Sequence, residues 1–152
     1  MHTVKDFEQF LAHVRNETGV EALEADEAGL ASVRVDDKFN LNLQFVEPSD
    51  KILCFVEVTE IPSSAPSSIY RDLLAAALFG AETAGGYFAM EKDSGTVVYN
   101  YLFDFDKAAA DPSAFAETLE NILTLCEDWQ GRISAGLIAD DAPVSPYHGM
   151  LV

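Results

Sequence analysis

Residues 39–45 read Phe-Asn-Leu-Asn-Leu-Gln-Phe, a strict alternation of apolar and polar side chains. Successive side chains of a β-strand point to opposite faces, so this period predicts a strand with one buried face and one open face. Residues 31–35 alternate in the same way, whereas residues 52–58 carry branched and aromatic side chains on both faces and predict a more central strand. Short turns separate the three runs, which together predict an antiparallel meander.

A helix is expected on each side of this meander. Before it, apolar residues recur at helical spacing between Thr3, a good N-cap that forms a capping-box variant with Asp6, and Gly19, a natural C-terminal stop. After it, prolines and serines at residues 62–68 interrupt the strand pattern, and a second helix is predicted over residues 66–79.

Two further strands and a long helix complete the pattern. The turn at residues 92–95 has a glycine at its tight position and predicts a hairpin between strands at 87–91 and 96–103. The last helix begins after Asp111, with Pro112 at the first helical position, where a missing N–H is no loss. Apolar residues then repeat at helical spacing over about six turns.

The expected element order is therefore α-β-β-β-α-β-β-α, without β-α-β alternation. This order predicts an α+β fold, a twisted antiparallel sheet packed against helices, and not a doubly wound parallel sheet. A length of 152 residues suits one domain, which we place at residues 1–136. Residues 137–152 contain two prolines and an acidic pair and are expected to form a flexible C-terminal tail.

The net charge of −17, from 26 acidic and 9 basic residues, excludes several partners. Such a chain repels the phosphates of nucleic acids and the headgroups of anionic membranes. Hydrophobic residues make up 49% of the chain, which is enough for a core and too many for intrinsic disorder. With no secretory signal and no apolar run long enough to span a bilayer, we expect a cytoplasmic protein without membrane insertion, in which Cys54 and Cys126 are reduced and buried.

No pattern in the sequence indicates catalysis or metal binding. The glycine motifs that bind phosphate and the serine nucleophile motif are missing. Asp104 and Asp106 are expected on one face of a strand end, and a small metal-dependent hydrolase using this pair is the enzyme alternative. With 26 acidic residues such pairs arise often by chance, so we expect no catalytic residue, no metal and no cofactor. The three histidines lie near the termini without ligand-spaced partners: His2, His13 and His148.

Two elements carry more apolar surface than a small core needs. The helix at 66–79 is rich in Leu, Ala and Phe, and the strand at 96–103 is apolar on both faces. Such a strand buries both faces or presents one to a partner, so the two elements favour self-association. The acidic charge would keep such a protein soluble.

Several stretches of the chain resemble sequences of a known family: residues 32–37, 39–45, 52–62, 73–79 and 86–98. In these stretches, in its acidity and in its element order, the chain resembles the class I type III secretion chaperones, the Tir-chaperone (CesT-like) group. The strand-turn-strand sequence around Asp93-Ser94-Gly95 is the most specific part of the resemblance. The resemblance covers about residues 4–132.

The resemblance implies a binding protein without catalytic activity. Chaperones of this family are homodimers that bind the N-terminal chaperone-binding segment of a secreted effector without ATP and keep it soluble and export-competent. By position, the second helix and the last two strands would form the dimer interface, with Ile69, Leu73, Leu74, Leu78, Val98 and Tyr101. The first helix and the sheet would supply apolar grooves for the effector, with Phe7, Phe10, Leu11, Phe39, Leu41 and Phe45. The acidic charge is then expected to lie away from the groove beside the first helix and away from the second helix. The alternative is a YbjN-like regulatory or binding module of the same fold with no secretion client.

Overall fold

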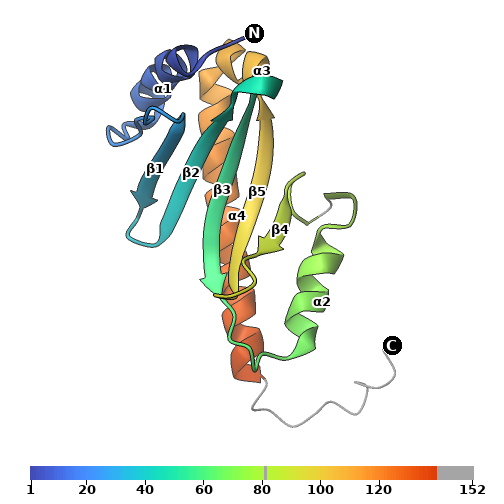
Figure 1. Cartoon of the computed structure of the whole chain (residues 1–152). Helices are drawn as coiled ribbons and strands as arrows, with labels where there is room; N and C mark the ends of the chain where they lie inside the picture. The colour runs from blue at the N-terminus through green and yellow to red at the C-terminus, as the bar shows by residue number, and fades with distance from the viewer. Residues whose placement is uncertain (81, 140–152) are drawn as a thin grey trace.

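The computed structural model describes residues 1–80 and 82–139, which form a five-stranded sheet with helices (Figure 1). The elements in chain order are α1 (Val4–Thr18), β1 (Leu30–Val35), β2 (Phe39–Val46), the 3₁₀ turn η1 (Glu47–Ser49), β3 (Lys51–Glu60), α2 (Ser67–Ala76), the 3₁₀ turn η2 (Leu78–Gly80), β4 (Tyr87–Met90), β5 (Thr96–Asp104), α3 (Phe105–Ala110) and α4 (Pro112–Ala139). The α+β class and the expected order of the main elements are confirmed. The short helix α3 and the two 3₁₀ turns are additions.

The sheet has the strand order β1-β2-β3-β5-β4, and all neighbouring strands are antiparallel. The first three strands form the expected meander. β5 then pairs along β3, with a bulge between Glu57 and Thr59, and the short strand β4 pairs only with residues 97–100 of β5. The hairpin of β1 and β2 therefore lies at one edge of the sheet, and β4 lies at the other.

Two helices cover one face of the sheet (Figure 1). α4 runs along the length of the sheet behind it, whereas α1 lies only over the end near the N-terminus. α2 stands beside β4, where it contacts α4. Because α1 stops short, the free end of the β1–β2 hairpin faces α4 directly.

The core fills the layer between the sheet and the helices α1 and α4. Phe7 of α1 stacks on Phe45 of β2 with ring centroids 5.5 Å apart, and Phe10 meets Phe115 of α4 edge-on at 4.9 Å. The alternating apolar residues of β2 point into this layer and are buried, as their period predicts. Burying each such side chain stabilises the fold by about 1.5–3 kcal/mol, so this layer is what holds α1 in place.

The ends of α1 lie where the sequence predicts them. The Thr3 backbone N–H donates to Asp6 Oδ2 at 2.8 Å, and the Asp6 backbone N–H donates to Thr3 Oγ1 at 3.4 Å, which completes a capping box. At the other end Gly19 has a φ of +73°, and its N–H donates to the Arg15 carbonyl at 2.8 Å. A residue without a Cβ adopts this left-handed conformation at little cost.

The second helix ends earlier than the spacing of its apolar residues predicts. α2 stops at Ala76 instead of continuing to Phe79, and the chain turns through η2. Phe79 has a φ of +56°, which interrupts the helical hydrogen-bond ladder, and its side chain is 97% exposed. Apolar spacing alone does not predict this break. It marks Phe79 as part of the buried helix face, whereas the side chain is exposed.

The end of β5 also differs from the expectation. Asp104 does not face Asp106 along a strand, because it is the N-cap of α3 and its Oδ2 accepts the Lys107 backbone N–H at 3.2 Å. The last helix α4 spans 28 residues and ends at Ala139, three residues past the expected domain boundary at 136. The rest of the expected flexible tail, residues 140–152, lies outside the described residues. In the parts of the chain that the structure describes, no helix is long and apolar enough to span a bilayer.

Candidate binding surfaces

The six residues expected to bind an effector are all buried, and the structure divides them into two groups. Phe7, Phe10, Leu11 and Phe45 fill the core between α1 and the sheet. Phe39 and Leu41 lie further along β2, beyond the cover of α1, where they form the floor of a groove. Only these two are therefore placed at a cavity that opens to the surface.

This groove, which we call the hairpin groove, lies between the β1–β2 hairpin and α4 and has a volume of about 350 Å³. Its upper end is closed by the C-terminal part of α1 and the segment after it. The lining residues are Thr18, Val20, Leu23, Val33, Val35, Asp36, Lys38, Phe39, Leu41, Ala116, Leu119, Glu120, Leu123, Thr124 and Glu127. Val33, Val35 and Leu123 are half-buried, so apolar side chains in the walls are accessible from solvent.

The mouth of the hairpin groove is formed by the turn between β1 and β2. Asp36 and Asp37 both have left-handed φ values, +54° and +53°, and the Lys38 backbone N–H donates to the Val35 carbonyl at 3.0 Å. The turn spans the three residues 36–38, because Val35 pairs with Phe39 across the hairpin, and its last residue, Lys38, lies over the groove. There Lys38 Nζ donates to Glu127 Oε1 of α4 at 2.8 Å.

Sequence reasoning missed the α4 side of this groove. Leu123 belongs to the apolar repeat of the last helix. It directly follows Ile122, which is buried, so its side chain lies at the side of the buried helix face. The groove also contradicts our expectation for the acidic charge, because Asp36, Glu120 and Glu127 line it. The hairpin groove thus combines an apolar floor with charged side chains at its edge.

The residues expected at a dimer interface do not form one surface. Leu74 and Leu78 are 75% and 62% exposed, whereas Ile69 and Leu73 are buried against the rest of the molecule. Val98 and Tyr101 of β5 are half-buried and, an odd number of residues apart on one strand, point to opposite faces of the sheet. Of the six, only Leu74 and Leu78 are largely exposed.

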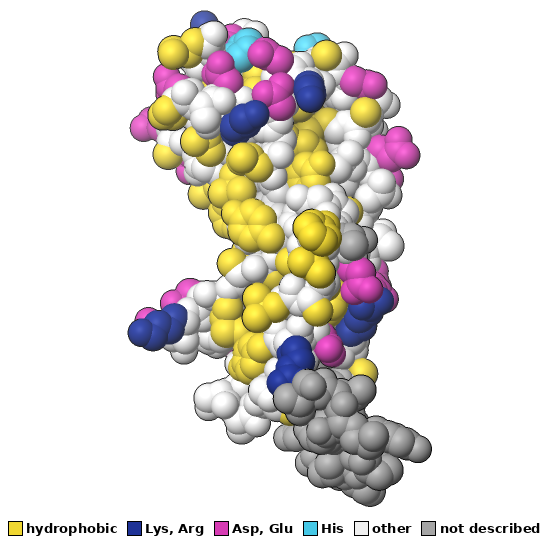
Figure 2. All heavy atoms as spheres, turned by 90° about the vertical axis from the view of Figure 1, so that its right-hand side faces the viewer, with side chains coloured by type: hydrophobic (Ala, Val, Ile, Leu, Met, Phe, Trp, Pro, Cys, Tyr) yellow, Lys and Arg dark blue, Asp and Glu magenta, His cyan; other side chains and the backbone are white. Residues whose placement is uncertain are grey.

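The structure adds apolar residues that the sequence reasoning did not select. Phe79, Tyr87 and Met90 are all exposed, and they lie in η2 and β4, next to α2. α2 and β4 also enclose an apolar hollow of about 300 Å³, lined by Tyr70, Leu73, Leu74, Ala77, Phe88, Ala89, Met90 and Val97. Figure 2 shows hydrophobic side chains gathered on this side of the molecule. We call this region the α2–β4 surface.

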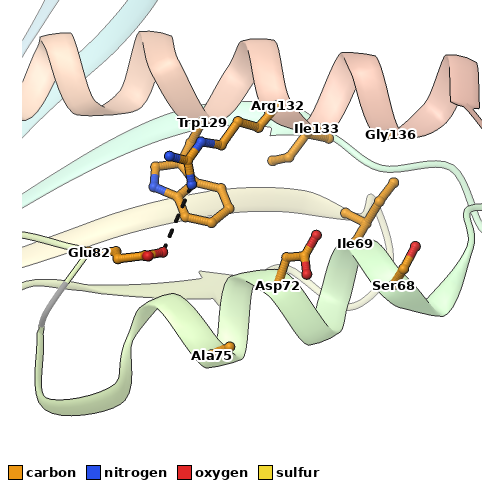
Figure 3. Close-up of a pocket in the computed structure, with 9 residues that line it drawn as sticks. All are labelled: Ser68, Ile69, Asp72, Ala75, Glu82, Trp129, Arg132, Ile133 and Gly136. Atoms are coloured by element: carbon orange, nitrogen blue, oxygen red, sulfur yellow. Dashed lines mark ion pairs between the residues drawn. The ribbon is translucent and has the colours of Figure 1, made fainter. Parts of the chain in front are cut away.

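The orientation of α2 depends on its contact with α4. Between α2 and α4 lies a small hollow of about 230 Å³ (Figure 3). In it the guanidinium of Arg132 lies over the indole of Trp129, 4.7 Å from the ring centroid, and its Nη1 lies 3.9 Å from Glu82 Oε2. At the end of the hollow, Gly136 allows Ile69 to pack close to the α4 backbone. The Ile69–Gly136 contact holds α2 against α4, and the Arg132–Glu82 contact joins the segment after η2 to the same helix.

The remaining reactive groups have structural roles. Cys54 and Cys126 are free and buried, as expected, and burial raises the pKa of the Cys126 thiol to about 12, so it is protonated at neutral pH. Hydrogen bonds from the Lys51 ammonium and from the Lys107 backbone hold the pKa of Asp104 below its usual value. Its neighbour Asp106 accepts a hydrogen bond from His2 Nε2 at 2.6 Å, away from Asp104. Within the described residues no group of three or more potential metal ligands is present.

A family model described as the Tir chaperone protein (CesT) family matches residues 9–130. The chain belongs to this family. The match covers all of the sheet and both walls of the hairpin groove. Comparison with curated protein sequences gives no significant match.

Several solved structures share the fold of this CesT-family chain. The ExsC–ExsE complex superposes with a TM-score of 0.71 at 22% identity, over 86% of this chain and 95% of that chain. The Yersinia pestis type III secretion chaperone SycH, in complex with a fragment of YscM2, gives 0.58 at 20% identity, over 78% and 98%. The ExoU–SpcU complex of Pseudomonas aeruginosa gives 0.57 at 18% identity, over 86% and 96%.

Proposed function

We propose that this CesT-family protein is a type III secretion chaperone of the cytoplasm. It binds the N-terminal chaperone-binding segment of a secreted effector as a homodimer, without ATP, and keeps that segment soluble and ready for export. The observation that carries the proposal is the hairpin groove, an apolar cavity of about 350 Å³ that stays open in a chain of this family. The three structures that share the fold, ExsC–ExsE, SycH with a YscM2 fragment and ExoU–SpcU, are each complexes of two different proteins.

The hairpin groove is the proposed effector site. Phe39 and Leu41 form its floor, and Val33, Val35 and Leu123 offer accessible apolar surface in its walls. Apolar side chains of an extended or helical effector segment would lose contact with water there, which is favourable by about 25 cal/mol per Å² of apolar surface buried. The four expected residues in the core, Phe7 among them, would act indirectly by holding α1 and β2 in place.

The α2–β4 surface is the proposed dimer interface. Leu74, Leu78 and Phe79 expose large apolar side chains beside one another in sequence, and Met90 of β4 adds to them. A two-fold symmetric contact pairs such a patch with its own copy, and large apolar patches on soluble proteins mark sites of association.

The proposal is tested by affinity capture from the native host with the tagged wild-type protein and with Leu123→Glu, which places a charge in the groove wall. We expect mass spectrometry to identify a secreted protein that the wild type retains and Leu123→Glu loses. The N-terminal fragment of that protein, produced separately, should bind with the same dependence on Leu123. Leu102→Glu is the control, since it makes the same change at an exposed leucine of β5, outside the groove.

Two results would count against the proposal. If the captured protein binds through a region other than its N-terminal segment, the chaperone function is wrong. If no secreted protein depends on Leu123 while the dimer forms normally, the YbjN-like alternative, a module of the same fold without a secretion client, becomes the better reading.

A further inference from the structure

We propose that the hairpin groove selects effector segments in which apolar side chains lie next to lysine or arginine, and that the Lys38–Glu127 ion pair is a latch that such a basic residue replaces. This inference rests on the proposed function, because it assigns a chemistry to the segment that the groove binds. It is carried by the charges at the rim of the groove and by the geometry of the ion pair that crosses it.

The rim of the groove is acidic although its floor is apolar. Glu120 and Glu127 are seven residues apart on α4, so they project from the same face of the helix, with Leu123 between them. Asp36 faces them from the tip of the hairpin. All three carboxylates are exposed, and Lys38 is the one basic residue among the residues that line the groove. The rim therefore carries more negative than positive charge.

Lys38 joins the two walls of the groove. Its Nζ lies 2.8 Å from Glu127 Oε1 and 5.9 Å from the centroid of the Phe39 ring, so its side chain extends from the hairpin over the floor to α4. The turn is held by Arg34, whose Nη2 donates to the Asp37 carbonyl at 2.9 Å. Among the described residues this is the only ion pair between the hairpin and α4.

The ion pair is easily replaced. The side chains of Lys38 and Glu127 are 42% and 62% exposed, and exposed pairs of this kind contribute little to stability because water and salt screen them. A cation on the bound segment forms the same contact with Glu127 and gains Asp36 and Glu120 as further partners. An acidic residue in that place meets three carboxylates on a protein whose net charge is −17. The rim thus favours basic flanks and disfavours acidic ones.

The first part of the test is a selection from a displayed random peptide library on the immobilised full-length protein and on Leu123→Glu. We expect the peptides that bind the wild type and not Leu123→Glu to be enriched in Lys and Arg beside apolar residues. Groove-dependent peptides without this enrichment would overturn the charge selectivity and leave the groove as a peptide site. If no peptide depends on Leu123, the proposed effector site is wrong, and the latch with it.

The second part measures the affinity of one selected basic peptide, labelled with a fluorophore, by fluorescence anisotropy. Glu127→Gln should weaken binding about 2- to 5-fold, because it removes a carboxylate that the peptide cation uses. Lys38→Met should strengthen binding by a similar factor, because it removes the competing cation. Both effects should shrink at high salt. Glu47→Gln is the matched control, since Glu47 is exposed at the other end of β2.

The two substitutions distinguish a latch from a structural ion pair. Both break the same contact, so a pair that only holds the hairpin in place would change affinity in the same direction in both variants. Opposite signs support the proposal. Equal signs, or an effect of Glu47→Gln as large as that of Glu127→Gln, overturn it.

Discussion

Tyr99 Oη donates a hydrogen bond of 2.7 Å to the carbonyl oxygen of Thr83, and both side chains are fully buried. Thr83 in turn donates from Oγ1 to the Gly86 carbonyl at 2.6 Å. These two bonds hold residues 83–86, which precede β4, against Tyr99 of β5. They determine where the α2–β4 surface lies relative to the sheet, and burial keeps the phenol neutral by raising the pKa of Tyr99.

Gly86→Ala should destabilise the protein strongly. A Cβ at residue 86 would collide with Tyr99 Oη and with the Asn100 carbonyl, so the turn has to shift and its buried hydrogen bonds are strained. We expect a loss of about 2–3 kcal/mol in the free energy of unfolding, measured by urea denaturation. Gly131→Ala is the matched control, because a Cβ there meets nothing within 4 Å and alanine favours α4, which should raise stability by about 0.5–1 kcal/mol. Equal effects of the two substitutions would show that the close approach at Gly86 is unimportant.

Phe7→Ala should act on stability and not specifically on effector binding. Phe7 is fully buried and stacks on Phe45, so its removal leaves a cavity under α1. We expect a loss of about 3–5 kcal/mol, seen as a lower denaturation midpoint. Val35→Ala, in the wall of the hairpin groove, should cost much less because Val35 is only half-buried. A stable Phe7→Ala protein with weakened peptide affinity would place the effector site at α1 instead of at the hairpin groove.

Leu74→Glu should abolish the proposed dimer and leave the monomer folded. The side chain is 75% exposed, so a charge there costs the monomer little, whereas in a symmetric contact two carboxylates would be brought together and desolvated. Size-exclusion chromatography with light scattering should give a dimer mass for the wild type and a monomer mass for Leu74→Glu at micromolar concentration. Leu102→Glu makes the same change at another exposed leucine and should remain dimeric. A dimer that survives Leu74→Glu would exclude α2 from the interface.

Acid should weaken the start of α1. Hydrogen bonds from the backbone and hydroxyl of Thr3 hold the pKa of Asp6 below its usual value. A carboxyl group whose pKa is lower in the folded state stabilises the fold above its unfolded pKa, about 3.9, and this contribution is lost as the pH falls through the folded-state pKa. Thr3→Ala should lower stability at neutral pH by about 1 kcal/mol through loss of the cap, and should reduce the stability change between pH 5 and pH 2. An acid profile unchanged by Thr3→Ala would show that Asp6 is not responsible for it.

Local chemistry explains why the elements were predictable from the sequence. The alternation of residues 39–45, the capping box at Thr3 and Asp6, and Pro112 at the start of α4 act between neighbours in the chain, so their effect is visible without the fold. α2 is the instructive exception. Its apolar residues continue to Phe79, but the helix ends at Ala76. There the Glu82 backbone N–H donates to the Ala76 carbonyl at 3.2 Å, a contact across a turn that the apolar spacing does not encode.

By itself the sequence determined the α+β class, the order of the elements, the acidic charge and the resemblance to the CesT family. Only the tertiary structure decided which apolar residues are core and which are surface. Phe7 and Phe39 have the same side chain and similar burial, yet one lies under α1 and the other beneath an open groove. The physical reason is that α1 is shorter than the sheet that it covers, a relationship between elements far apart in the chain. Lys38 and Glu127 are likewise far apart in the sequence, by 89 residues, and no local pattern encodes their contact across the groove.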